Sequence, residues 1–195
     1  MSGIFCFINN RNLTANENMK KISLLTLGLF YFGIINASPC ATDSIPVNQK
    51  DVESVNAIIG SLYNVISGSA GEKRNWDRMR TLFLADAKMI PSGKVSGGIM
   101  TLRMLGVEDY IGIVGPALEK NGFFETEVNQ KTEQFGSIAH VFSTYESRKT
   151  LSDEKPFMRG INSIQLWNDG KRWWIVSVFW QAETTENPIP GKYLN

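Results

Sequence analysis

The sequence predicts an α+β fold, with three N-terminal helices packed on a strongly curved antiparallel sheet that forms a cone-shaped roll. Apolar residues recur at steps of three and four between residues 52 and 121, the spacing typical of amphipathic helices. From residue 123 onward the pattern changes to runs of β-branched and aromatic residues separated by turn signals. Helices followed by a strand-rich half favour α+β over alternating βα units.

Three segments carry the helical pattern. The first, residues 51–66, has an apolar stripe and ends at the glycine-rich stretch SGSAGEK. The second is short and begins after Asn75, a residue type that caps helix N-termini. The third runs from residue 107 to about residue 121, and Pro116 should kink it or end its first part.

Strands are predicted near residues 123–134, 137–149, 158–168 and 172–183, with Asn-Asp-Gly as the turn of the last hairpin. An earlier short strand, ADAKMIPSG, should end at Pro91 and Gly93. The segment after it, residues 92–106, is too apolar for an ordinary surface loop. We therefore expect that segment to fold back as a flap or an extra strand.

The N-terminal segment has the pattern of a secretory signal peptide over residues 19–41. Two lysines precede an uncharged stretch, residues 22–35, which is shorter than the roughly 20 residues that span a bilayer. A membrane anchor or a buried helix is the alternative. We expect cleavage after Ala37 or Ala41, no stable membrane anchor afterwards, and export to the periplasm or the medium. Residues 1–18 fit no part of a signal peptide, and we expect translation to begin at Met19.

The mature chain is then a flexible lead-in over residues 42–50, one domain over residues 51–183 and a C-terminal tail over residues 184–195. The charge of the full sequence is nearly balanced, with 20 Lys+Arg against 19 Asp+Glu, which argues against a nucleic-acid partner. One histidine and two cysteines offer no metal-ligand spacing, and both cysteines lie within or beside the segment removed. No cofactor-binding motif is recognisable, so neither a metal nor a cofactor is predicted.

Four patches in order carry a family resemblance: WDRMRTLFLADAKMIPSG, GVEDYIGIVGPAL, AHVFSTYES and NDGKRWWIVSVFW. Together they resemble the nuclear transport factor 2-like superfamily, whose cystatin-like, cone-shaped members include SnoaL-like polyketide cyclases and ketosteroid isomerases. The resemblance covers residues 51–183 and suggests an exported bacterial member. It implies an apolar pocket between the concave sheet and the helices, and a possible homodimer through the sheet. It implies no single reaction.

The isomerase chemistry of that superfamily does not carry over. Ketosteroid isomerases have a carboxylate base before the proline of the strand after the second helix, and Ile90 stands there in this chain. They also use a tyrosine of the first helix as a hydrogen-bond donor. Tyr63 lies in that helix, but its spacing differs from the family's by about two residues.

His140, the only histidine, lies in the strand IAHVFSTYESR. If its side chain faces the cone, it is a candidate catalytic acid/base with a pKa near neutrality. If it faces the other side, it is a hydrogen-bonding residue of the sheet.

The remaining pocket candidates come from the alternation of side chains along strands and from their place in the helices. In the last strand Trp173, Ile175, Ser177, Phe179 and Gln181 share one face, which has the mixed character of a pocket wall. The full set of predicted pocket-lining residues is Tyr63, Trp76, Tyr110, Gln165, Ser177, Phe179 and Gln181. Glu125 and Glu127 share one face of their strand and are either an acid/base pair or solvated edge charges.

Three functions remain open from the sequence. The first is an exported domain that binds a small apolar or aromatic ligand. The second is an isomerase, cyclase or dehydratase that uses His140 with a Tyr or Glu partner. The third is a protein-interaction module that uses the sheet face. Whether the protein is an enzyme is not decided by the sequence.

Overall fold

The computed structural model describes residues 45–95 and 98–194. The predicted upstream extension, signal peptide and cleavage sites lie outside the described residues. Within those residues, no helix is both long enough and apolar enough to cross a membrane.

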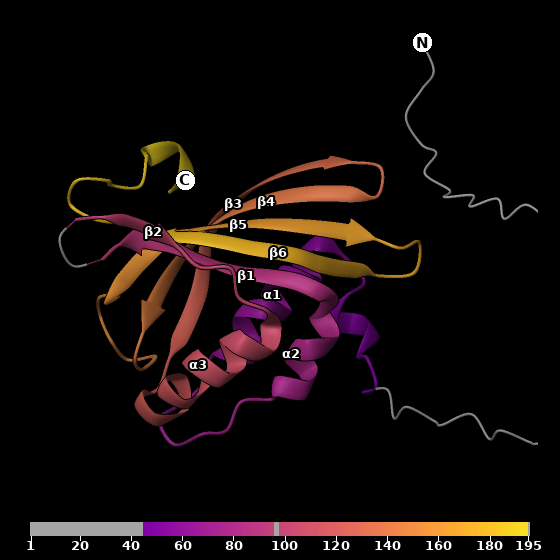
Figure 1. Cartoon of the computed structure of the whole chain (residues 1–195), viewed down its shortest axis with the longest axis horizontal. Helices are drawn as coiled ribbons and strands as arrows, with labels where there is room; N and C mark the ends of the chain where they lie inside the picture. Colours follow the sequence, from indigo (N-terminus) through magenta and orange to yellow (C-terminus); the bar gives the residue numbers. More distant parts are fainter. Residues whose placement is uncertain (1–44, 96–97, 195) are drawn as a thin grey trace, which may run out of the picture. The chain divides into compact units, whose positions relative to one another are not determined.

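The fold consists of three α-helices, two short 3₁₀ helices and one six-stranded sheet in the described part of the chain (Figure 1). In chain order the elements are η1 (Gln49–Asp51), α1 (Val55–Ile66), α2 (Trp76–Leu82), β1 (Phe83–Lys94), β2 (Met100–Leu102), α3 (Val107–Asn121), β3 (Phe124–Phe135), β4 (Ile138–Arg148), β5 (Met158–Asn168), β6 (Trp173–Ala182) and η2 (Gly191–Tyr193). The predicted α+β class and the four C-terminal strands are confirmed. The expected flap after Gly93 forms the extra strand β2.

The sheet has the order β2-β1-β6-β5-β4-β3 and is mixed rather than wholly antiparallel. Strands β3 to β6 form an antiparallel meander, in which each strand pairs with the next one along the chain. β1 instead pairs in parallel with β6, a strand far away in the sequence. The prediction of a purely antiparallel sheet is therefore wrong at this pairing. Local sequence patterns do not indicate the pairing, because the helix α3 and the whole meander separate the two strands in the chain.

β-Bulges bend the sheet into a cone. The register of β3 shifts around Val128, and that of β6 shifts around Val176. An extra residue at such a position bends and twists the strand that carries it. All three α-helices lie on one side of the curved sheet (Figure 1).

Local sequence explains where the helices begin and end. The side chain of Ser54 caps α1 by accepting from the amide of Ala57, so α1 begins later than the apolar pattern suggested. Asn75 caps α2 as predicted. α3 continues through Pro116 to its predicted end instead of stopping there.

The core lies between the helices and the concave face of the sheet. Ile58 of α1, Leu82 of α2 and Ile164 of β5 are fully buried in it. α3 packs closely on α2 at Gly115, where the lack of a side chain leaves room for the Trp76 ring. A Cβ on Gly115 would lie 3.0 Å from that ring. The cavity lies in the part of the cone beside α3.

Candidate functional site

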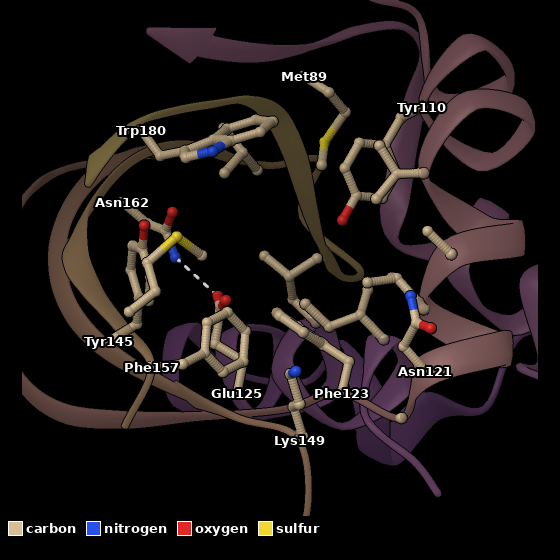
Figure 2. Close-up of a pocket in the computed structure, with 18 residues that line it drawn as sticks. Met89, Tyr110, Asn121, Phe123, Glu125, Tyr145, Lys149, Phe157, Asn162 and Trp180 are labelled. Carbon is tan, nitrogen blue, oxygen red and sulfur yellow. Dashed lines mark hydrogen bonds between the residues drawn. The ribbon is translucent and has the colours of Figure 1, made fainter. Parts of the chain in front are cut away.

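A cavity of about 400 Å³ lies inside the cone, between α1, α3 and the concave face of the sheet (Figure 2). Its lining residues are Leu62, Ile66, Met89, Tyr110, Val114, Ala117, Leu118, Asn121, Gly122, Phe123, Glu125, Tyr145, Lys149, Phe157, Met158, Asn162, Val178 and Trp180. Tyr145 and Asn162 are buried at its inner end, whereas Asn121, Lys149 and Phe157 are exposed and mark the mouth.

Aromatic rings form much of the wall. Tyr110 of α3 and Trp180 of β6 meet edge to face, with ring centroids 6.2 Å apart. Phe123 and Phe157 make a second edge-to-face pair, with centroids 6.3 Å apart, near the mouth. The wall is therefore apolar and shaped by rings with defined orientations.

Glu125 of β3 is the carboxyl group of this cavity. Its two oxygens accept hydrogen bonds from the Ser147 hydroxyl at 3.0 Å and from the Asn162 amide at 3.3 Å. Both donors are neutral, and burial among apolar groups raises the pKa of Glu125 to about 7. The group can therefore exist in either protonation state near neutral pH.

A hydrogen-bond network behind Glu125 fixes the inner end of the cavity. The Ser143 hydroxyl donates to Glu127, so the Tyr63 hydroxyl, 2.6 Å from Ser143 Oγ, must donate to Ser143. The Asn162 amide nitrogen donates to the Tyr63 oxygen at 3.0 Å and also donates to Glu125. These two hydrogen bonds together fix the position of the amide. This network leaves the Asn162 side chain a single orientation.

The hydroxyls of Tyr110 and Tyr145 have no such partner. Both side chains line the cavity, and no group in residues 45–95 or 98–194 hydrogen-bonds either hydroxyl. Burial raises the pKa of each, so both stay protonated at neutral pH. Gly160 of β5 is the cross-strand partner of Tyr145 and leaves room for its ring. A Cβ on Gly160 would lie 2.5 Å from the tyrosine oxygen.

The structure brings some of the predicted site residues to this cavity and leaves others elsewhere. Tyr110 lines it, and Tyr63 lies directly behind it in the network. Trp76 packs on α3 instead, with its ring nitrogen donating to Glu119 at 3.0 Å. Gln165 is exposed and pairs across strands with His140, on the outer face of the sheet.

The predicted pocket face of the last strand is divided by its bulge. Trp173 and Ile175 face the core, but after the extra residue at Val176 the alternation is inverted. Val178 and Trp180 therefore line the cavity. The predicted lining residues Ser177, Phe179 and Gln181 lie on the other face, because strict alternation does not hold across a bulge.

His140 also lies on the outer face. Its neighbours in β4, Ala139 and Val141, are buried in the core, so the His140 side chain points away from the cone. Its Nε2 lies 3.0 Å from Ser163 Oγ, and its ring contacts Phe142 edge to face. The geometry is that of the hydrogen-bonding residue that the sequence offered as the alternative to a catalyst.

Sequence reasoning did not single out Glu125, Tyr145 and Asn162 as one site. The sequence predicts that Glu125 and Glu127 share one face of β3 but does not indicate whether that face lines the cone; their spacing of two residues was the available signal. The different environments of the two carboxyls were not visible, because they depend on residues of β4 and β5 that come much later in the chain.

Comparison with known proteins shows the fold. No family model and no curated protein matches the chain. A solved structure from Nostoc punctiforme, described as having a cystatin-like fold, has a TM-score of 0.51 at 10% identity and covers 67% of this chain and 90% of that chain.

Two further similar structures are NTF2-like proteins. The one from Silicibacter pomeroyi has a TM-score of 0.48 at 13% identity and covers 67% of this chain and 94% of that chain. The one from Shewanella baltica has a TM-score of 0.44 at 14% identity and covers 66% of this chain and 90% of that chain. Identity at this level bears on fold and not on activity. The chain has the cystatin-like fold that its sequence predicts.

Proposed function

We propose that the protein binds a small, mostly apolar molecule in the cone cavity, with one polar group of that molecule at Glu125. The observation that carries this proposal is a cavity of about 400 Å³ with an aromatic wall and a carboxyl inside it. Ligand pockets typically combine such an apolar wall with a few polar groups that fix orientation.

Filling the cavity tests this proposal. The probe is N-phenyl-1-naphthylamine, an aromatic molecule that is uncharged at neutral pH and fluoresces when it enters an apolar site. We expect saturable fluorescence with the wild-type protein. Val114→Trp, which places an indole in the cavity, should weaken binding at least about tenfold by excluding the probe.

Ile113→Trp is the matched control, because residue 113 directly precedes Val114 in α3 and its side chain is 51% exposed. It should bind the probe within about twofold of wild type, since it leaves the cavity open. Circular dichroism checks that both variants are folded. Equal binding by Val114→Trp and wild type would place the probe outside the cavity and contradict the proposal.

A second candidate is acid–base catalysis at the same carboxyl. A pKa of about 7 lets Glu125 take or give a proton at physiological pH, which is the range in which a general acid/base is most effective. In this candidate Glu125 replaces His140 as the catalytic group, because His140 lies on the opposite face of the sheet.

Deuterium exchange tests the catalytic candidate. The probe is 2-indanone in D₂O, whose α-protons are followed by NMR; the base removes an α-proton and the enolate takes a deuteron from solvent. Glu125→Gln should remove protein-dependent exchange, and His140→Ala should retain it. The opposite result would return the role to His140, and no exchange above buffer with wild-type protein would remove this candidate.

Export remains part of the proposal and rests on the sequence of residues 19–41. When the full chain is expressed in a bacterium, the mature protein should appear in the periplasmic fraction or the medium. Its intact mass should correspond to cleavage after Ala37 or Ala41. Uncleaved protein confined to the cytoplasm would contradict export. The homodimer and the interaction module through the sheet also stay predictions.

A further inference from the structure

We propose that the cavity takes a protonated amine with a flat apolar body, whose ammonium group binds between the Glu125 carboxylate and the hydroxyls of Tyr110 and Tyr145. This inference rests on the proposed function, because it names the chemical class of the ligand of the same cavity. The apolar body would lie against the aromatic wall toward the mouth.

The first argument is the missing charge partner of Glu125. Its oxygens receive hydrogen bonds from Ser147 and Asn162, both neutral, and no ion pair to it occurs within residues 45–95 and 98–194, where Lys149 lines the mouth of the same cavity. An ionised carboxyl away from water is costly unless an opposite charge pairs with it. An ammonium group of a ligand supplies that charge at the carboxyl, where no side chain of the described chain forms an ion pair.

The second argument is the composition of the wall around this carboxyl. Five of the lining side chains carry aromatic rings: Tyr110, Phe123, Tyr145, Phe157 and Trp180. Ring faces attract cations, and this attraction grows when the cation is shielded from water. An aromatic wall beside an unpaired carboxylate favours a cationic ligand over a neutral one of the same shape.

The third argument is the supply of acceptors. A primary ammonium has three N–H donors, and one carboxylate oxygen satisfies one of them. The oxygens of Tyr110 and Tyr145 are without hydrogen-bond partners within the described chain and can accept the others. In Figure 2 the Tyr110 hydroxyl comes from the side of α3 and the Glu125 carboxyl from the opposite side of the cavity.

The pH dependence follows from the groups that face Glu125. They are Tyr63 from α1, Tyr110 from α3, Glu127 from β3, Tyr145 from β4, Asn162 from β5 and, at the mouth, Lys149; β1 and β6 contribute the uncharged Met89, Val178 and Trp180. Burial keeps the three tyrosines protonated. Affinity for an amine should therefore rise as Glu125 ionises near pH 7 and fall again where the amine loses its proton.

Three probes that share an indole ring but differ in charge test whether the cavity prefers a cation. They are tryptamine (cation), tryptophol (neutral) and indole-3-acetate (anion). Isothermal titration calorimetry at about pH 8 should give a dissociation constant for tryptamine at least about tenfold below that for tryptophol, since a charge-assisted contact replaces a neutral one. Indole-3-acetate should bind more weakly than both, because its charge repels the carboxylate. From about pH 6 to about pH 8, tryptamine binding should strengthen and tryptophol binding should not.

Glu125→Gln removes the charge and keeps the shape and the acceptor oxygen. It should weaken tryptamine binding about tenfold or more and change tryptophol binding less than about twofold. Glu133→Gln, on the same strand but exposed on the outer face opposite His140, is the matched control and should change neither. Thermal melts check that both variants are folded.

The outcomes separate this inference from the proposed function. If tryptophol binds as tightly as tryptamine at about pH 8, or if Glu125→Gln keeps wild-type affinity for tryptamine, the cavity is not an amine site although it still binds ligands. If none of the indole probes nor the naphthylamine binds, the binding function fails as well. Binding of tryptamine that Val114→Trp leaves intact would place the amine elsewhere and also overturn the inference.

Discussion

Glu125 and Glu127 show how position alone gives two identical side chains different properties. They lie two residues apart on one face of β3, and each accepts a hydrogen bond from a serine of β4. Burial raises the pKa of both. Glu125 is half-buried and lines the cavity, whereas Glu127 is exposed and is not one of the lining residues. Chemistry at neutral pH therefore concentrates on the inner carboxyl.

Glu125 should make stability depend on pH. Its pKa is about 7 in the folded protein, against an ordinary glutamate value of 4.5, so between these values the folded state binds a proton that the unfolded state has lost. Stability should therefore fall as pH rises from about 4.5 to about 7, by at most about 3.4 kcal/mol. Urea unfolding across this range should show a smaller fall in Glu125→Gln; an unchanged slope would assign the effect to other groups.

Tyr63 and Tyr145 form a matched pair for testing the network. Removing the Tyr63 hydroxyl takes one hydrogen bond from each of the buried residues Ser143 and Asn162, which keep only their bonds to Glu127 and Glu125. Tyr63→Phe should therefore lower the free energy of unfolding by about 1 to 3 kcal/mol. Tyr145→Phe removes a hydroxyl that has no hydrogen bond in the described chain, and should cost less than about 0.5 kcal/mol. Equal losses in urea unfolding would contradict the network.

At the scale of elements, bulges decide which residues meet the ligand. The extra residue at Val176 turns Val178 and Trp180 inward and Phe179 outward. Without it, the polar Ser177 and Gln181 would face the cone. This part of the cavity wall is apolar because the bulge in β6 interrupts the alternation of inward and outward side chains.

Two glycines in different elements should respond in opposite ways to alanine. At Gly160 of β5 a methyl group would collide with Tyr145 and the backbone of β6, so Gly160→Ala should lose more than about 2 kcal/mol and weaken naphthylamine binding. At Gly60, in the middle of α1, a methyl meets open space, so Gly60→Ala should gain about 0.5 to 1 kcal/mol. Thermal and urea unfolding measure both; a stable Gly160→Ala that binds normally would show that Tyr145 is not held this way.

At the scale of the whole molecule, the C-terminal segment lies on the side of the sheet away from the helices (Figure 1). Thr144 donates a hydrogen bond of 2.7 Å to the carbonyl of Tyr193, and the Tyr193 ring contacts Phe142. The predicted tail therefore belongs to the folded domain and covers part of the outer sheet face. A dimer through that face would have to form beside this segment.

Deleting residues 188–195 should lower stability by about 1 to 3 kcal/mol, because it exposes the apolar surface under Ile189 and Tyr193. Naphthylamine binding should stay within about twofold of wild type, since none of these residues lines the cavity. Fluorescence titration and urea unfolding of the truncated chain test both statements. Loss of probe binding in a folded truncation would show that the tail supports the cavity.

The sequence determined the class of the fold, the helices and the meander of strands. These features follow from local periodicity, caps and turn residues such as Asn75 and Asn-Asp-Gly, and they are fixed by neighbours in the chain. The sequence also placed Glu125 and Glu127 on one face of their strand, because alternation holds between them.

Only the tertiary structure decided which of these residues form a site. The parallel pairing of β1 with β6, the bulge at Val176 and the outward direction of His140 all depend on partners distant in the sequence. The same is true of the pKa of Glu125, because burial by residues from α1, α3, β4 and β5 sets it. Local patterns specify elements, whereas a binding site is made by side chains that only the packed fold brings together.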